Sequence, residues 1–90
     1  MISINTKKFH IVKDVHFKDD NLCLNIDGKD YSFPLKDHSS VLLKASDIER
    51  NYFEIDHSGY GIHWPMIDED ISIDGLLGII HRPQRMSMAK

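Results

Sequence analysis

The Asp27-Gly28 step lies between two runs of alternating apolar and polar residues, and it constrains the fold more than any other feature. Residues 22–26 and residues 31–35 each place an apolar side chain at every second position. A type I′ turn needs positive φ at both central residues, and Asp-Gly adopts this conformation readily. The stretch 22–35 therefore predicts a β-hairpin with one apolar face, and Pro34 marks the end or the edge of its second strand.

Residues 9–17 alternate in the same way and predict another strand. Its apolar face would carry four side chains: Phe9, Ile11, Val15 and Phe17. The opposite face would carry three solvated polar side chains: His10, Asp14 and His16. Joined to the hairpin through a turn at 19–21, this strand completes a three-strand antiparallel meander.

The next segment has helical spacing and can cover the apolar face of the meander. Apolar residues recur three and four positions apart over residues 41–48. Asp37 or Ser39 stands where a helix N-cap belongs, and Ser46 with Glu49 three residues later matches a capping box. We therefore expect a helix that breaks and restarts at Ser46.

Alternation returns over residues 53–55 and 60–64, with a turn signal between them at 57–59. This pattern predicts a second hairpin that ends at Pro65. The fold class is thus α+β, an antiparallel three-strand meander plus a second hairpin, packed against two or three short helices.

The last of these helices is predicted from an amphipathic stripe of four apolar residues: Ile73, Leu76, Leu77 and Ile80. Ser72 or Asp70 would cap its start. Asp74 would lie in the first turn, where its charge faces the positive end of the helix dipole.

Ninety residues, 41% hydrophobic and 28% charged, suit one small globular domain. We assign residues 1–80 to this domain and residues 81–90 to a basic, flexible C-terminal tail. A single cysteine excludes an internal disulfide framework, and no apolar run approaches the length of a membrane span or a secretory signal. These features predict a cytoplasmic protein with no membrane association.

The net charge of −3 is unevenly distributed along the chain. Residues 81–90 contain three basic residues and no acid, whereas residues 1–80 contain eight basic and fourteen acidic residues, a balance of −6. Affinity for nucleic acid comes mainly from neutralising phosphates, so the acidic body disfavours nucleic acid as a partner. The tail is interpreted as a solvated end rather than a binding arm.

Acidic residues cluster just before the last predicted helix, which raises the question of a metal site. Asp68, Asp70 and Ser72 match the alternating oxygens that open a calcium-binding loop. Such a loop needs Gly at its sixth position and a bidentate acid at its twelfth, where the chain has Ile73 and Ile79. We therefore predict helix capping, no metal and no cofactor, with a metal held by Asp68 and Asp70 as the alternative.

Histidine is frequent, with six residues, but none has the spacing of a zinc site. His63 precedes three carboxylates, one of which could orient it as a general base. The competing interpretation places His63 on the outward face of its strand without a catalytic role. Trp64 either anchors the core or is half exposed as an anchor for a partner. No serine lies in a nucleophile motif.

Three stretches carry a family resemblance: "DGKDYSFPL" at 27–35, "LLKASDIERNYFEI" at 42–55 and "GYGIHWPMIDEDISIDGLL" at 59–77. Over residues 9–80 the chain resembles the bacterial family of domains of unknown function 2442 (DUF2442). The resemblance implies a small α+β domain and carries over neither an activity nor catalytic residues. Some relatives continue into a helix-turn-helix module, for which no room follows here. Many family genes lie beside a gene for another small protein, as in toxin–antitoxin pairs.

The leading hypothesis is a non-enzymatic protein-interaction module, the acidic partner of a small basic protein in a toxin–antitoxin-like or regulatory pair. Its predicted surface combines one aromatic residue with exposed charge: His63, Trp64, Asp68, Glu69 and Asp70. Strand addition or self-association at a sheet edge is another geometry. The alternative is a small metal-dependent enzyme or ligand-binding domain that uses His63 with Asp68 and Asp70.

Overall fold

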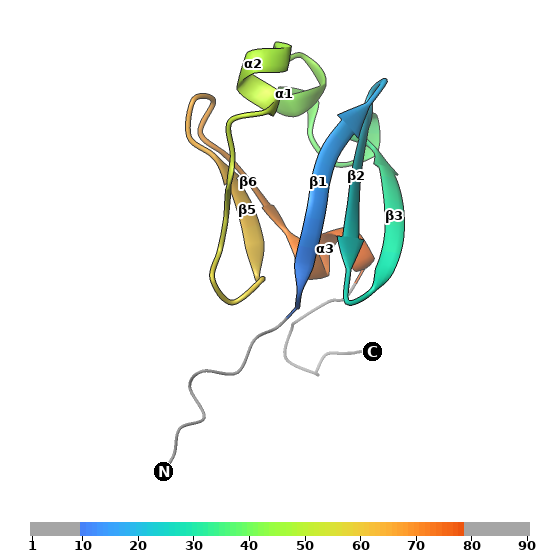
Figure 1. The fold of residues 1–90 in the computed structure, drawn as a ribbon. Coiled ribbons are helices and arrows are strands. Elements are labelled where there is room, and N and C mark those ends of the chain that lie inside the picture. The colour runs from blue at the N-terminus through green and yellow to red at the C-terminus, as the bar shows by residue number, and fades with distance from the viewer. Residues whose placement is uncertain (1–9, 79–90) are drawn as a thin grey trace, which may run out of the picture.

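The computed structural model describes residues 10–78 of the chain. This part contains two three-stranded antiparallel sheets, ordered β1-β2-β3 and β4-β5-β6. The sheets stand opposite each other, with the short helices α1 and α2 across one end and α3 at the other (Figure 1). The predicted α+β class is confirmed.

The first sheet is the predicted meander. It consists of β1 (Val12–Lys18), β2 (Asn21–Ile26) and β3 (Lys29–Pro34). The turn between β2 and β3 has the expected positive φ at both central residues, 54° at Asp27 and 91° at Gly28. Every second residue of β2 is buried, which confirms the alternation on which the prediction was based.

The alternation predicted for residues 9–17 is wrong in its first half, because β1 contains a bulge. The register with β2 shifts between Lys13 and His16, and Asp14 has a φ of 55°. The extra residue reverses which positions face inward, so Val12 packs against the core while Ile11 is exposed. Phe9 lies outside the described residues.

The connection between the sheets is the interrupted helix that the sequence predicted. It comprises the 3-10 helix η2 (Leu35–Asp37), α1 (Ser40–Leu43) and α2 (Asp47–Arg50). Of the two predicted caps, Ser39 is the one used: its hydroxyl accepts a hydrogen bond from the Leu42 amide at 3.0 Å. Ser46 and Glu49 form the predicted capping box, which confirms the restart at Ser46.

The second sheet has one strand more than the predicted hairpin. It is built from β4 (Glu54–Ile55), β5 (Gly61–Trp64) and β6 (Glu69–Ser72). The charges of β6 suggested a capping segment, yet full antiparallel pairing with β5 makes it a strand. Helix α3 (Ile73–Leu77) follows at once, capped by Ser72 and with Asp74 in its first turn, as expected. Ile80 lies outside the described residues.

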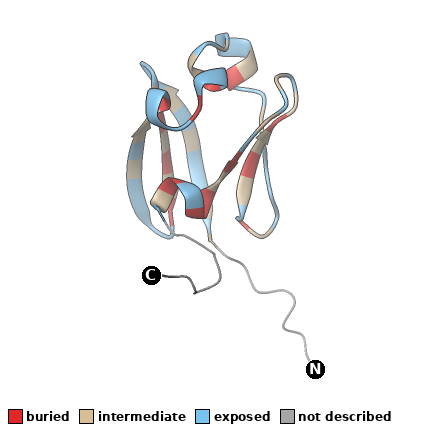
Figure 2. Cartoon of the chain, turned by 180° about the vertical axis from the view of Figure 1, so that it is seen from behind, coloured by how far each residue is buried: buried red, intermediate tan, exposed pale blue. Residues whose placement is uncertain are grey.

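The core fills the space between the two sheets, where the inward residues of β2, β5 and β6 meet (Figure 2). Its fully buried members come from both sheets and from the helices: Leu22, Ile26, Leu35, Leu42, Ile62, Trp64 and Ile73. The Trp64 ring makes an edge contact with Phe17 and a tilted contact with Phe53, at centroid distances of 6.2 and 6.1 Å.

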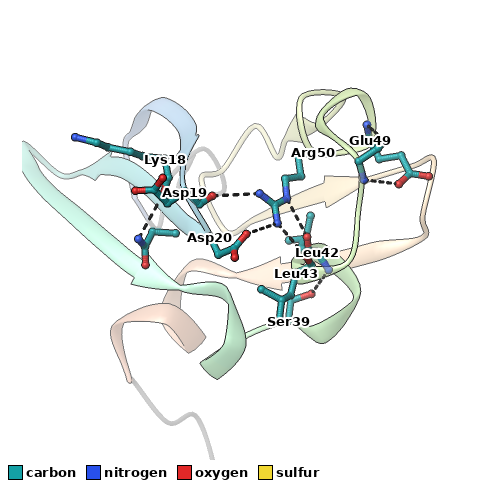
Figure 3. A network of polar contacts seen from close by, with 10 residues as sticks. Lys18, Asp19, Asp20, Ser39, Leu42, Leu43, Glu49 and Arg50 are labelled. Atoms are coloured by element: carbon teal, nitrogen blue, oxygen red, sulfur yellow. Dashed lines mark hydrogen bonds and ion pairs between the residues drawn. The ribbon is translucent and has the colours of Figure 1, made fainter.

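A buried arginine connects the helical segment to the β1–β2 turn (Figure 3). The Arg50 guanidinium donates to the carbonyl oxygens of Leu42 and Leu43, each at 3.0 Å. It also donates to the Asp19 carbonyl at 3.2 Å and to the Asp20 carboxylate at 3.0 Å. Since only 7% of Arg50 is exposed, its charge is stabilised by these acceptors rather than by water.

Replacing Arg50 with Met should leave three carbonyl oxygens and one carboxylate without their donor. We expect the free energy of unfolding, measured by urea denaturation, to fall by about 3 kcal/mol or more. The matched control is Lys36→Met, since Lys36 is an exposed base in η2 and its loss should change stability by less than about 0.5 kcal/mol. Equal small losses in both variants would contradict a central role for Arg50.

Candidate interaction surface

Three side chains form a row across the outward face of the second sheet. Glu54 of β4 is the register partner of His63 in β5, and His63 is the register partner of Asp70 in β6. Directly opposed residues in antiparallel strands project from the same face. Because Ile62 and Trp64 point into the core, His63 and its two neighbours point away from it.

This row lies in a shallow depression with a volume of about 770 Å³, which we call the concave face. It is bordered by β4, by the β4–β5 turn and by the outward side of β5 and β6. The side chains of interest are three acids, two histidines and two apolar residues: Glu54, Asp56, Asp70, His57, His63, Ile55 and Tyr60. No lysine or arginine is among the described residues that line it. The concave face is therefore negatively charged, and the partly exposed Ile55 and Tyr60 lie at its border.

His63 and Asp70 form a close pair in the middle of the concave face. Nδ1 of His63 lies 2.7 Å from Oδ1 of Asp70. An ionised carboxylate only accepts, so Nδ1 is the donor and Nε2 is the nitrogen available to another group. Both side chains are well exposed, so the pair adds little to stability.

Asp56 holds the β4–β5 turn at the edge of the concave face. Its carboxylate accepts a hydrogen bond from the Ser58 hydroxyl and one from the Ser58 amide at 3.1 Å. These bonds, the hydroxyl first, lower the pKa of Asp56 below its ordinary value. Asp56 therefore carries its negative charge at neutral pH.

The structure separates the five residues predicted to form one surface. His63 and Asp70 come together on the concave face, whereas Asp68 lies in the β5–β6 turn with a φ of 51°. Trp64 is fully buried and donates from Nε1 to the Arg50 carbonyl at 2.8 Å. Its inclusion in the surface is wrong, because alternation along β5 turns it inward beside the outward His63.

Glu69 also points inward. As the register partner of Trp64, it projects toward the helical segment and accepts a hydrogen bond from the Ser39 hydroxyl. Ser39 is buried and at the same time caps α1. Glu69 thus supports a helix cap instead of contributing exposed charge.

The alternative prediction, a metal held by Asp68 and Asp70, finds no third ligand among the described residues. Within residues 10–78 no group of three or more His, Cys, Asp or Glu side chains is arranged to hold a metal ion. Asp68 is not among the described residues that line the concave face, while Asp70 is paired with His63.

Comparison with known proteins places this chain in a family. A family model described as "Protein of unknown function (DUF2442)" matches residues 12–82. The chain belongs to the DUF2442 family. No curated protein and no solved structure matches it. Among the described residues of this DUF2442 domain, no helix is both long and apolar enough to cross a membrane.

Sequence reasoning missed Glu54, Asp56 and Tyr60 as parts of the surface. The available signal was the alternation over 53–55 and 60–64, which predicted the hairpin but not its register. Once Glu54 is paired with His63, the two must share a face. Register depends on the length and shape of the β4–β5 turn, which the sequence did not reveal.

A second polar cluster was also missed, at the start of the described chain. His10 was expected on a solvated face, yet only 12% of its side chain is exposed. Its ring lies between two carboxylates, with Nδ1 2.7 Å from Asp27 and Nε2 2.6 Å from Asp74. These hydrogen bonds, that to Asp27 first, raise the pKa of His10 above its ordinary value. The expectation was wrong because the bulge in β1 shifts the alternation.

The opposite orientations of Glu69 and Asp70 can be tested by changing each to alanine. Glu69→Ala removes the acceptor of the Ser39 hydroxyl, so we expect the free energy of unfolding to fall by about 1–2 kcal/mol. Asp70→Ala removes only an exposed pair and should cost less than about 1 kcal/mol. Urea denaturation of both variants measures the difference, and a larger loss for Asp70→Ala would contradict this assignment.

Proposed function

We propose that this DUF2442 domain is a protein-interaction module whose concave face binds a basic segment of a partner protein. The observation that carries the proposal is the composition of this face: three carboxylates, no lysine or arginine among the described lining residues, and two exposed apolar side chains. A cationic segment would complement this charge, and its apolar side chains would cover Ile55 and Tyr60.

The charge of the whole described domain favours a basic partner. Residues 10–78 contain six Lys and Arg against fourteen Asp and Glu, a balance of −8 with neutral histidines. A field of this sign attracts cationic proteins and repels phosphate-rich ligands. Complementary charge chiefly speeds encounter and suppresses wrong partners.

The apolar residues would supply the affinity that surface charge alone does not. Tyr60 and Ile55 are 47% and 39% exposed, and both border the concave face. Tyrosine is enriched among residues that dominate binding energy, because it buries a large ring while its hydroxyl remains hydrogen-bonded. We therefore place the anchor of the interface at Tyr60 and its charged rim at Glu54, Asp56 and Asp70.

Our more specific proposal is that the partner is a small basic protein and that the two form a toxin–antitoxin-like or regulatory pair. Its support is the acidity of the domain together with the gene arrangement that the family resemblance implies. In such a pair the acidic concave face would cover a cationic surface of the partner.

A second candidate function is favoured by the His63–Asp70 pair. A histidine that bonds a carboxylate through one ring nitrogen and lines an open depression has the arrangement of a general base. On this view the concave face binds a small ligand and His63 accepts a proton from it. A reaction lost in His63→Gln, with ligand binding retained, would distinguish this function from a protein interface.

The main proposal is tested by capture of the partner from native cytosol on the tagged protein. The variant Glu54→Gln/Asp56→Asn/Asp70→Asn removes three charges from the concave face with little change in shape. The control Asp30→Asn/Asp37→Asn/Asp47→Asn removes three exposed charges outside it. The captured protein is then purified and its affinity measured by fluorescence anisotropy at low and moderate salt.

We expect the first triple variant to bind the partner about tenfold or more weakly and with a smaller salt dependence. The control should bind within about twofold of the original chain, because its changes lie away from the interface. Equal weakening in both triples would mean that net charge, and not the concave face, determines binding. The absence of any stoichiometric partner would remove the proposal's support.

A further inference from the structure

With both neighbouring carboxylates ionised, the contacts of the His10 ring select one protonation state of the imidazole. Both ring nitrogens lie within hydrogen-bond distance of a carboxylate oxygen, at 2.7 Å from Asp27 and 2.6 Å from Asp74. A neutral imidazole has one N–H donor, whereas an imidazolium has two. Ionised carboxylates only accept, so an imidazolium is the form that satisfies both contacts at once.

The positions of the two carboxylates make this contact a junction between distant parts of the chain. Asp27 belongs to the β2–β3 turn, and its other oxygen accepts from the Ile11 amide at 2.8 Å. Asp74 belongs to the first turn of α3, and its side chain is only 7% exposed. The ring therefore links the first sheet to the helix that follows the second sheet.

The backbone of His10 contacts the β4–β5 turn. The His10 amide donates to the Ser58 carbonyl at 3.3 Å. A Cβ atom on Gly59 would lie 1.8 Å from the carbonyl oxygen of His10, so the two backbones touch. Gly59 also has a φ of 73°, which favours glycine. This turn contributes Asp56, His57 and Tyr60 to the concave face.

We propose that His10 is a pH-responsive clip: in its charged form it binds Asp27 and Asp74 together and thereby holds the β4–β5 turn at the border of the concave face. When the ring loses its proton, one nitrogen presents a lone pair to a carboxylate. The contact between that nitrogen and its carboxylate then becomes unfavourable and opens, and the β4–β5 turn loses this support.

The direction of the pH effect follows from the two pKa changes. Hydrogen bonds raise the pKa of His10 above 6.5 and lower that of Asp27 below 3.8. Stability from the raised histidine is complete below 6.5 and is lost as the pH rises through the folded-state pKa. Stability from the lowered carboxyl is complete above 3.8 and is lost as the pH falls through its folded-state pKa. Both contributions are therefore complete between pH 3.8 and pH 6.5. The clip opens as the pH rises through the folded-state pKa of His10.

Other titratable groups lie close enough to matter for the test. Among the described residues, Asp27 and Asp74 are the charged groups hydrogen-bonded to the ring, one from each element packed against it. The β4–β5 turn contacts the His10 backbone and carries Asp56 and the exposed His57. His16 is exposed on β1, where its Nδ1 bonds the Asp14 carbonyl. Variants of His57 and His16 therefore serve as controls.

The first measurement is an NMR titration of the histidine ring nitrogens in the full chain. We expect His10 to show two protonated ring nitrogens at a pH where a solvated histidine peptide is mostly neutral. The Asp27→Asn variant, which alters a half-exposed carboxyl, should lower the pH at which His10 loses its proton. A neutral His10 ring in the folded protein at that pH would overturn the proposal.

Amide hydrogen exchange then reports whether the clip holds the turn. The protection factors of the His10 and Gly59 amides, corrected for intrinsic exchange, should fall about tenfold as His10 loses its proton, as expected for loss of one charge-assisted hydrogen bond. His10→Gln should show low protection at every pH, whereas His16→Gln and His57→Gln should keep the original pH dependence. The clip would be refuted if the protection factors did not change with pH, or if their pH dependence disappeared in His57→Gln and remained in His10→Gln.

The consequence for binding rests on the proposed function: affinity for the basic partner should weaken as the clip opens. The NMR and exchange measurements need no partner, so they judge the clip by itself. Tight binding that is independent of the His10 titration would overturn regulation by the clip while leaving the interaction module intact.

Discussion

The fold depends on the buried side chain and carbonyl of Arg50. Its guanidinium ties the C-terminal end of α1 to the β1–β2 turn of the first sheet, and its carbonyl accepts a hydrogen bond from the Trp64 indole N–H of the second sheet. The same residue thus joins helix, first sheet and second sheet. The arginine is favoured here over lysine because its planar fork reaches several carbonyl oxygens at once. The ring of Phe17 also lies over the guanidinium, with 5.5 Å between its centroid and Cζ of Arg50, and contacts Trp64.

The inward position of Trp64 determines the concave face. In a strand, neighbouring side chains point to opposite faces, so an inward Trp64 places His63 outward. Register then brings Glu54 and Asp70 to either side of His63 and sends Glu69 inward to the Ser39 cap. One buried aromatic residue therefore separates acids that are adjacent in sequence into structural and exposed groups.

Features that depend on neighbouring residues could be predicted from the sequence. The Asp27-Gly28 turn, the Ser46 capping box and the Ser72 cap all follow from local backbone chemistry. Features that depend on distant contacts could not. The bulge at Asp14 changed the face on which His10 lies. Pairing with β5 made residues 69–72 a strand despite their charged side chains. Of the predicted surface, His63 and Asp70 lie on the concave face. Parity along the predicted strand accounts for His63, whereas Asp70 was predicted only as exposed charge before the last helix.

The acids of the domain differ in whether a partner within the fold compensates their charge. Asp20 pairs with Arg50, while Asp27 and Asp74 share the charge of His10. Within the described chain, the three acids of the concave face pair with no lysine or arginine: Glu54, Asp56 and Asp70. Acidic residues spread evenly over the surface would be enough to keep a small protein soluble. Gathering carboxylates that pair with no lysine or arginine in one depression, beside an exposed tyrosine, instead produces a surface whose charge a cationic partner can neutralise.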